Sequence, residues 1–168
     1  MFIDESGAKT NMTRLRGRAR RGERVYACCP HGHWQTTTMI SSIRVDGSTA
    51  CMAIDGATDT EVFEAFVHRV LRPSLQPGDV VIMDNLSPHK GASVLDLIKQ
   101  AGSEVMFLPA YSPDLNPIEK MWSKVKTHLR SAEARTQDTL INAIAAALGR
   151  VTRQDAINWF ASCGYSII

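Results

Sequence analysis

The run of apolar residues at positions 80–83 constrains the fold of this chain more than any other segment. Its sequence, Val-Val-Ile-Met, lacks the polar alternation of a half-exposed strand. Such a continuous run is typical of a strand that is covered on both faces, as in a sheet flanked by helices. A turn-forming Gln76-Pro77-Gly78 precedes the run, and Asp84 follows it. We therefore expect an α/β fold in which Asp84 stands at the end of an inner strand.

Short segments rich in Val, Ile, Thr and Met predict the remaining strands. They lie at residues 1–5, 34–45, 48–54 and 104–108. Asp46-Gly47 is a two-residue hairpin signal between the second and third segments, so the first three strands are expected to form an antiparallel meander. The stretch at 6–24 is rich in Gly, Thr and Arg and predicts an exposed loop.

Apolar residues that recur at the helical period predict five helices. These lie at residues 58–72, 91–101, 117–130 and 138–148, with a last short helix capped by Thr152. Strand, helix, strand, helix and strand follow one another from residue 48 to residue 108, which implies parallel pairing through crossovers. The resulting layout is a five-stranded mixed sheet, with three antiparallel and then two parallel strands. At 168 residues, one domain is expected.

Three carboxylates stand where this layout brings strand ends together. Asp4 and Asp84 each follow an apolar strand, and both are expected at the carboxyl edge of the sheet. Residues 108–115 form a proline-rich loop that leads into a helix, with Pro117 suited to its first position and Glu119 in its first turn. Asn116 either caps this helix or binds a metal, and we favour the cap. A set of three carboxylates is a site that a hard divalent cation prefers.

Three segments of the sequence carry a family resemblance. They are residues 2–7 (FIDESG), 83–90 (MDNLSPHK) and 111–119 (YSPDLNPIE), with 34 residues between Asp84 and Glu119. The chain resembles the catalytic domain of a DDE transposase of the bacterial insertion-sequence branch of the mariner superfamily. The resemblance implies a ribonuclease-H-like (retroviral-integrase-like) α/β fold. It divides the single domain into a core at 1–130 and C-terminal helices at 131–168. We expect no counterpart of the N-terminal helix–turn–helix domain of full-length members in this chain.

The resemblance also implies a chemistry for the three carboxylates. Asp4, Asp84 and Glu119 would be the catalytic residues and the ligands of two Mg²⁺ or Mn²⁺ ions, with Asp4 bridging them. Such ions activate the attacking oxygen and stabilise the leaving one in phosphoryl transfer. The expected function is DNA strand cleavage and strand transfer in cut-and-paste transposition of an insertion sequence. Glu5 is a further carboxylate, but it should point away from Asp4 because side chains alternate along a strand.

Basic residues provide candidate DNA contacts. The net charge is only +2, yet residues 1–30 hold seven basic and three acidic side chains. The arginines form an expected phosphate-binding arm, although an Arg-rich run is also typical of a solvated loop; they are Arg14, Arg16, Arg18, Arg20, Arg21 and Arg24. Weaker candidates lie near Asp84 and along the Glu119 helix; they are Asn85, His89, Lys90, Lys120 and Lys124. Asn85 and His89 would contact the scissile phosphate or orient Asp84, and the lysines would contact phosphate or simply face solvent.

Composition and the N-terminal residues bear on the cellular location of the protein. No apolar run approaches the ~20 residues of a membrane span, and Asp4 and Glu5 interrupt any signal peptide. The four cysteines form no CxxC pair, so we expect a reduced, cytoplasmic, nucleoid-associated location in a bacterium. Expected partners are transposon-end and target DNA, a second copy in a homodimer, and an upstream-frame polypeptide with a helix–turn–helix.

Two other functions stay open at this point. The first is an inactive transposase remnant that only binds DNA or dimerises, which the early start of the first strand suggests. The second is a stand-alone ribonuclease-H-like nuclease that acts on RNA–DNA hybrids or DNA junctions. The motif at residues 111–119 argues against the second function, and the three intact carboxylates argue against the first.

Overall fold

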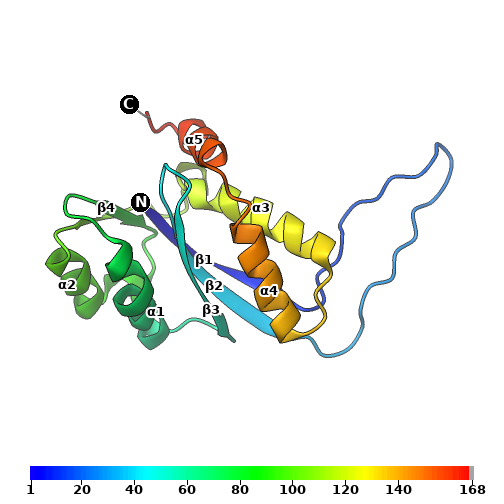
Figure 1. Ribbon diagram of the computed structural model, residues 1–168, viewed down its shortest axis with the longest axis horizontal. Helices are drawn as coiled ribbons and strands as arrows, with labels where there is room; N and C mark the ends of the chain where they lie inside the picture. Colours follow the sequence, from blue (N-terminus) through cyan, green and yellow to red (C-terminus); the bar gives the residue numbers. More distant parts are fainter. Residues whose placement is uncertain (167–168) are drawn as a thin grey trace.

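A mixed five-stranded sheet forms the centre of the computed structural model, which describes residues 1–166 (Figure 1). The strands are β1 (Phe2–Lys9), β2 (Thr36–Ile43), β3 (Thr49–Asp55), β4 (Val80–Met83) and β5 (Glu104–Phe107). Their order across the sheet is β3-β2-β1-β4-β5. The β1–β2 and β2–β3 pairs are antiparallel, and the β1–β4 and β4–β5 pairs are parallel. The predicted ribonuclease-H-like layout is therefore confirmed.

Helices cover both faces of the sheet (Figure 1). One layer comprises α1 (Thr60–Phe66), a π-helical turn η1 (Val67–Leu71), a 3₁₀ turn η2 (Arg72–Ser74) and α2 (Ala92–Gln100). The other layer comprises α3 (Pro117–Ala132), α4 (Gln137–Leu148) and α5 (Arg153–Ser162). Short 3₁₀ turns η3 (Ser87–Lys90) and η4 (Pro113–Leu115) precede α2 and α3. No helix within residues 1–166 is long and apolar enough to cross a membrane.

Two hydrophobic cores follow from the alternation of side chains along β1. Phe2 contributes to the core under α3, α4 and α5, whereas Ile3 contributes to the core under α1 and α2. The same alternation sends Asp4 toward the α3 layer and Glu5 toward the α1 layer. The α3 layer is anchored by Trp122, which is 1% exposed. Adjacent carboxylates on one strand thus have different environments.

Three sequence-based boundaries are wrong. The first strand does not end at Glu5: it continues to Lys9, because residues 6–9 pair with β2. The hairpin loop has five residues, Arg44–Ser48, with Gly47 in the left-handed conformation at φ 87°. The first helix begins at Thr60 rather than at residue 58, because Asp59 caps α1 by accepting a hydrogen bond from the Val62 N–H at 2.8 Å.

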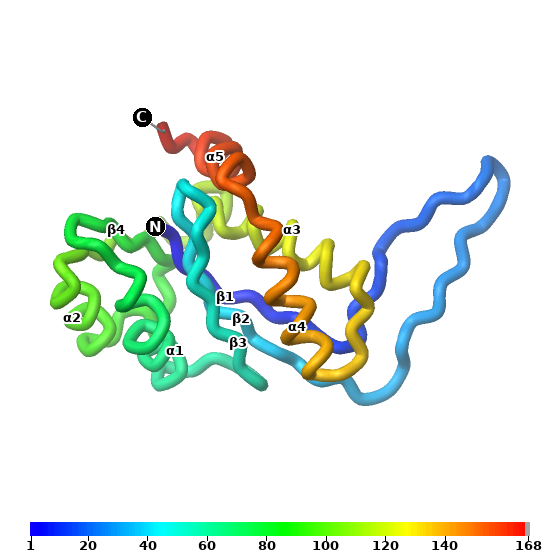
Figure 2. Tube along the Cα trace, viewed as in Figure 1, coloured from blue at the N-terminus to red at the C-terminus, as the bar shows by residue number. Residues whose placement is uncertain are grey.

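A long arm, residues 10–35, leaves the sheet between β1 and β2 and projects away from the body of the molecule (Figure 2). Its base is closed by two hydrogen bonds between Thr10 and Gln35, both of 3.1 Å. Every residue from 14 to 35 is exposed. Substitutions at residues 14–35 should therefore leave the two hydrophobic cores intact.

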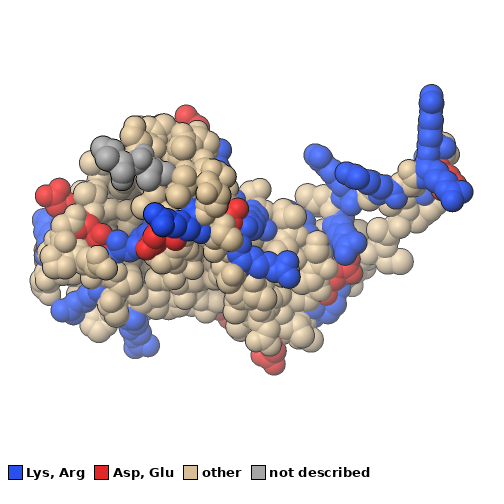
Figure 3. Space-filling view, turned by 45° about the horizontal axis from the view of Figure 1, so that its top comes forward, with Lys and Arg blue, Asp and Glu red and all other residues tan. Residues whose placement is uncertain are grey.

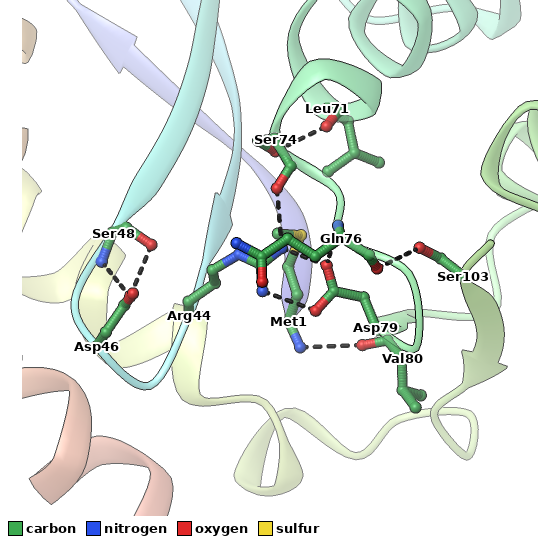
Figure 4. Close-up of polar contacts among 10 residues, drawn as sticks. All are labelled: Met1, Arg44, Asp46, Ser48, Leu71, Ser74, Gln76, Asp79, Val80 and Ser103. Atoms are coloured by element: carbon green, nitrogen blue, oxygen red, sulfur yellow. Dashed lines mark hydrogen bonds and ion pairs between the residues drawn. The ribbon is translucent and has the colours of Figure 1, made fainter. Parts of the chain in front are cut away.

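A polar cluster joins the antiparallel and parallel halves of the sheet (Figure 4). Arg44, in the β2–β3 loop, forms a two-pronged ion pair with Asp79, which precedes β4; its Nη1 lies 2.7 Å from Asp79 Oδ1. Arg44 Nη2 also donates to the Ser74 carbonyl at 2.9 Å. The β1–β4 ladder itself is short, with one register pair at Phe2 and Ile82. The ion pair therefore adds a second link across this junction.

We expect Asp79→Asn to destabilise the protein at neutral pH by about 1.5–3 kcal/mol, the usual value of hydrogen bonds to charged groups. The hydrogen bond from Arg44 lowers the pKa of Asp79 below its ordinary value of 3.8. A carboxylate with a depressed folded-state pKa stabilises the fold above the unfolded-state pKa and loses that contribution as pH falls. Urea unfolding should show a smaller difference in stability between the two proteins at pH 3 than at pH 6. An equal difference at both values would contradict this account, and Asp55→Asn, at an exposed position, is the control.

Candidate active site

The three predicted carboxylates line one pocket of about 360 Å³. Asp4 comes from β1, Asp84 follows β4, and Glu119 lies in the first turn of α3. Phe2 and Ile82 are register partners in the parallel pair. Asp4 and Asp84 each lie two residues further along, so both fall on the face that α3 covers. The fold thus brings together side chains that are 35 to 115 positions apart in the sequence.

Asp4 is the most strongly perturbed acid of the pocket. Burial and the nearby charge of Glu119 raise its pKa to about 7, with smaller contributions from Glu5 and Asp84. One opposing contact, from the Glu5 N–H to Asp4 Oδ1 at 2.8 Å, stabilises the charged form. Mutual repulsion of this kind is relieved when a cation lies among the carboxylates. The pocket is therefore electrostatically suited to a positive ligand.

Two residues that follow Asp84 in the chain, Leu86 and His89, contact its carboxylate. Burial acts to raise the pKa of Asp84, but the hydrogen bond and charge of His89 outweigh it, so the pKa lies below its usual value. His89 Nδ1 lies 2.6 Å from Asp84 Oδ1, and the Leu86 N–H donates to the same oxygen at 3.2 Å. Because both contacts use Oδ1, the second oxygen, Oδ2, is left for a ligand.

The loop between β5 and α3 supplies the wall of the pocket. Asn116 occupies the N-cap position of α3, but its side chain makes no capping hydrogen bond, so the predicted cap is wrong. Its buried Oδ1 has no hydrogen-bond partner among the described residues and lines the pocket. Tyr111, at the rim, is fully exposed and has a left-handed backbone with φ 57°. Such strain costs of order 1–3 kcal/mol and concentrates at functional sites.

The candidate DNA contacts fall into two groups. The six arginines of the arm are all exposed, as are Asn85, Lys90 and Lys120, and Asn85 lines the carboxylate pocket. His89 is completely buried, so it offers no surface to a phosphate, and of its two predicted roles only the contact with Asp84 fits. Lys124 is engaged within the fold, by Asp155 at 2.5 Å and the Arg150 carbonyl at 2.8 Å. The burial of His89 therefore contradicts its predicted DNA contact, whereas the DNA contact of Lys124, whose side chain is 36% exposed, stays a prediction.

A divalent cation fits the chemistry of the pocket. Within residues 1–166, no three His, Cys, Asp or Glu side chains are spaced closely enough to form a metal centre by themselves. The donors nevertheless suit Mg²⁺ or Mn²⁺: three carboxylates and the unpartnered Asn116 oxygen line the pocket. Hard cations prefer such oxygen ligands and retain several waters, so widely spaced carboxylates suffice to hold them.

One link in this region was missed by sequence reasoning. Glu5 points away from Asp4, as expected, but its Oε1 lies 3.1 Å from His89 Nε2, so it is joined to Asp84 through the histidine. The sequence does contain both parts of this link: Glu5 follows Asp4 directly, and His89 comes five residues after Asp84. Only the fold shows that these segments meet.

Comparisons with known proteins agree with this geometry. A family profile described as DDE superfamily endonuclease matches residues 1–141. Two Caenorhabditis briggsae proteins are similar in sequence. The Tcb2 transposable-element transposase is 29% identical over 85 residues, which are 48% of this chain and 31% of that protein. The Tcb1 transposase is 28% identical over 114 residues, which are 65% of this chain and 42% of that protein. The chain thus spans less than half the length of either relative.

Solved structures with this fold include the Mos1 transposase paired-end complex with the left transposon end. It has a TM-score of 0.72 at 16% identity, over 95% of this chain and 50% of that one. The catalytic core domain of BIV integrase has a TM-score of 0.52 at 15% identity, over 67% of this chain and 72% of that one. At such identities the likeness establishes the fold.

Proposed function

Because the chain belongs to the DDE superfamily endonucleases, we propose that it is a transposase catalytic domain that cleaves DNA strands and joins them to a target. The observation that carries the proposal is the convergence of Asp4, Asp84 and Glu119 on one pocket. We further propose that the element it mobilises is a bacterial insertion sequence that moves by cut-and-paste transposition. The motif at residues 111–119 and its 34-residue distance from Asp84 support that assignment.

The pocket residues divide the work of phosphoryl transfer. Asp4, Asp84 and Glu119 would hold two Mg²⁺ or Mn²⁺ ions. Bound there, the ions would activate the attacking oxygen and stabilise the leaving oxygen. We propose that Asn85 contacts the scissile phosphate, since it is exposed and lines the pocket. The first attack uses water, and the second uses the 3′-hydroxyl that the first releases.

The arm is the proposed DNA-backbone contact. Its basic side chains stand out along the projecting segment, away from the acidic residues of the body (Figure 3). Charged side chains on an extended segment can follow a phosphate backbone, and they release counterions when they bind it. Lys90 and Lys120 are exposed and supply further candidate contacts. We propose DNA ends and target DNA as the partners of this surface.

Other parts of the active assembly are proposed from the resemblance. The segments of relatives that lie beyond this chain leave room for a helix–turn–helix that recognises transposon ends, on the same or an upstream-frame polypeptide. We propose that a homodimer aligns two ends, and that the protein acts in the bacterial cytoplasm at the nucleoid. The core at 1–130 and the C-terminal helices at 131–168 are proposed to act as one domain, whose residues 167–168 lie outside the described part.

The proposal predicts metal-dependent nicking of a labelled DNA duplex that carries the element's own end. We expect nicks at the end with Mg²⁺ or Mn²⁺, none with EDTA, and joined products when target DNA is added. Nicking of an RNA–DNA hybrid in preference to the end would instead indicate a stand-alone ribonuclease-H-like nuclease. If no cleavage occurs even after a helix–turn–helix segment is supplied, the chain is an inactive remnant that only binds DNA or dimerises.

A further inference from the structure

A buried histidine connects two carboxylates on opposite sides of the sheet edge. His89 has no exposed surface, and its ring lies against Phe63 with centroids 4.2 Å apart and planes at 34°. Its Nδ1 lies 2.6 Å from Asp84 Oδ1, and its Nε2 lies 3.1 Å from Glu5 Oε1. Carboxylates only accept hydrogen bonds, so the ring donates from both nitrogens. The Phe63 contact and the two hydrogen bonds together determine the orientation of the ring.

The two carboxylates that His89 joins differ in their exposure. The Asp84 side chain is 36% exposed and opens into the pocket, whereas the Glu5 side chain is 17% exposed and lies behind the histidine. Glu5 is adjacent to Asp4 on β1 but projects to the other face of the sheet. It therefore contacts no ligand in the pocket directly. Apart from its charge, which contributes to the raised pKa of Asp4, Glu5 acts on the site through His89.

Asp84 depends on the contact with His89 because it lies in a short turn between β4 and η3. It follows β4, which ends at Met83, and precedes η3 at Ser87. The contact with His89 occupies Oδ1, so Oδ2 is the oxygen that can serve a ligand in the pocket that Asp84 lines. Groups that hydrogen-bond a metal ligand from behind commonly change metal affinity or activity ten- to a hundredfold when removed.

We propose that Glu5 is a positioning residue, which orients His89 so that His89 holds Asp84 in the geometry that binds the divalent cation. The inference rests on the proposed function, since it assumes that Asp84 is a metal ligand. It assigns different tasks to neighbouring residues of β1: Asp4 enters the pocket, and Glu5 supports Asp84 from the opposite face.

The test measures binding of Mn²⁺ alone to the full chain by electron paramagnetic resonance. Glu5→Ala should raise the Kd for Mn²⁺ ten- to a hundredfold. Glu5→Gln should bind close to the unsubstituted chain, because its amide oxygen still accepts from Nε2. Nicking by Glu5→Ala should fall at low Mn²⁺ and recover at saturating Mn²⁺. Glu64→Ala is the control, because Glu64 lies next to Phe63 on α1 and bonds to Ser93 rather than to His89.

A second pair of variants does not depend on the folding of Glu5→Ala. The first is His89→Phe, which keeps a ring against Phe63. The second combines His89→Phe with Glu5→Leu, which removes the Glu5 carboxylate that would otherwise lack its histidine partner. Both proteins should bind Mn²⁺ equally weakly, because Asp84 has lost its donor in each. Tight binding by either protein would overturn the proposal.

The remaining outcomes distinguish a failure of the Glu5 proposal from a failure of the proposed metal-dependent function. If Glu5→Ala binds Mn²⁺ normally while Asp84→Asn does not, the metal site stands and the role of Glu5 is refuted. If Glu5→Gln is as weak as Glu5→Ala, positioning by a hydrogen bond is likewise refuted. If Asp84→Asn and Glu119→Ala both bind Mn²⁺ normally, the pocket is not a metal site and both proposals fail.

Discussion

Asp84→Asn is expected to lower the rate of DNA strand cleavage by about a thousandfold or more while the protein stays folded. Metal ions contribute several kcal/mol of transition-state stabilisation, and each 1.36 kcal/mol corresponds to a factor of ten in rate. The amide lacks the charge that a cation requires. Its oxygen can still accept the Leu86 N–H, which lies 3.2 Å from Asp84 Oδ1. The local turn should therefore persist.

The measurement is nicking of the end-bearing duplex in Mg²⁺ or Mn²⁺, with circular dichroism and thermal melting as checks on the fold. Asp96→Asn is a matched control, since Asp96 is exposed on α2 and does not line the pocket. That variant should cleave normally. Cleavage by Asp84→Asn at the unsubstituted rate would remove Asp84 from the catalytic site.

The second large effect is expected in the arm. Changing Arg16, Arg18, Arg20 and Arg21 to Ala should weaken DNA binding and flatten its dependence on salt. Each phosphate contact contributes roughly 0.9 to the slope of log K against log salt on duplex DNA, so losing four contacts should reduce the slope by about 3–4. All four side chains are exposed on the projecting segment, and the thermal stability should therefore stay unchanged.

Binding is best measured by fluorescence anisotropy across a series of salt concentrations. The control removes four exposed charges elsewhere, at Arg69, Arg72, Lys99 and Arg153. Both variants have the same net charge, so a difference between them reports the position of the arginines rather than total charge. Equal slopes for the arm variant and the unsubstituted chain would show that the arm does not contact the DNA backbone.

Prediction from sequence succeeded where the signal was local. The strand at 80–83 was predicted with its observed bounds, because an uninterrupted apolar run between a turn and an aspartate is a short-range pattern. The predicted cap of the last helix is also confirmed, because Thr152 Oγ1 accepts a hydrogen bond from the Asp155 N–H at 3.1 Å. The predicted layout also brought Asp4, Asp84 and Glu119 together, and all three line one pocket.

Prediction failed where a distant segment decided the outcome. Residues 6–9 contain no strong strand signal, yet pairing with β2 makes them part of β1. His89 follows an exposed turn in sequence, but Phe63, Glu5 and Asp84 enclose it. Lys124 lies on a polar helix face that would be solvated if Asp155 did not approach it from α5.

The amino-acid sequence by itself determined the order of strands and helices and the identity of the three carboxylates, because periodicity, turns and motifs depend on neighbouring residues. Only the tertiary structure decided which polar side chains are available to a ligand. Among residues 1–166, Asn116 Oδ1 has no hydrogen-bond partner, His89 is enclosed, and the arm is exposed from residue 14 to residue 35. The physical reason is that burial and hydrogen bonding depend on partners brought together by the packing of distant segments, which no short stretch of sequence encodes.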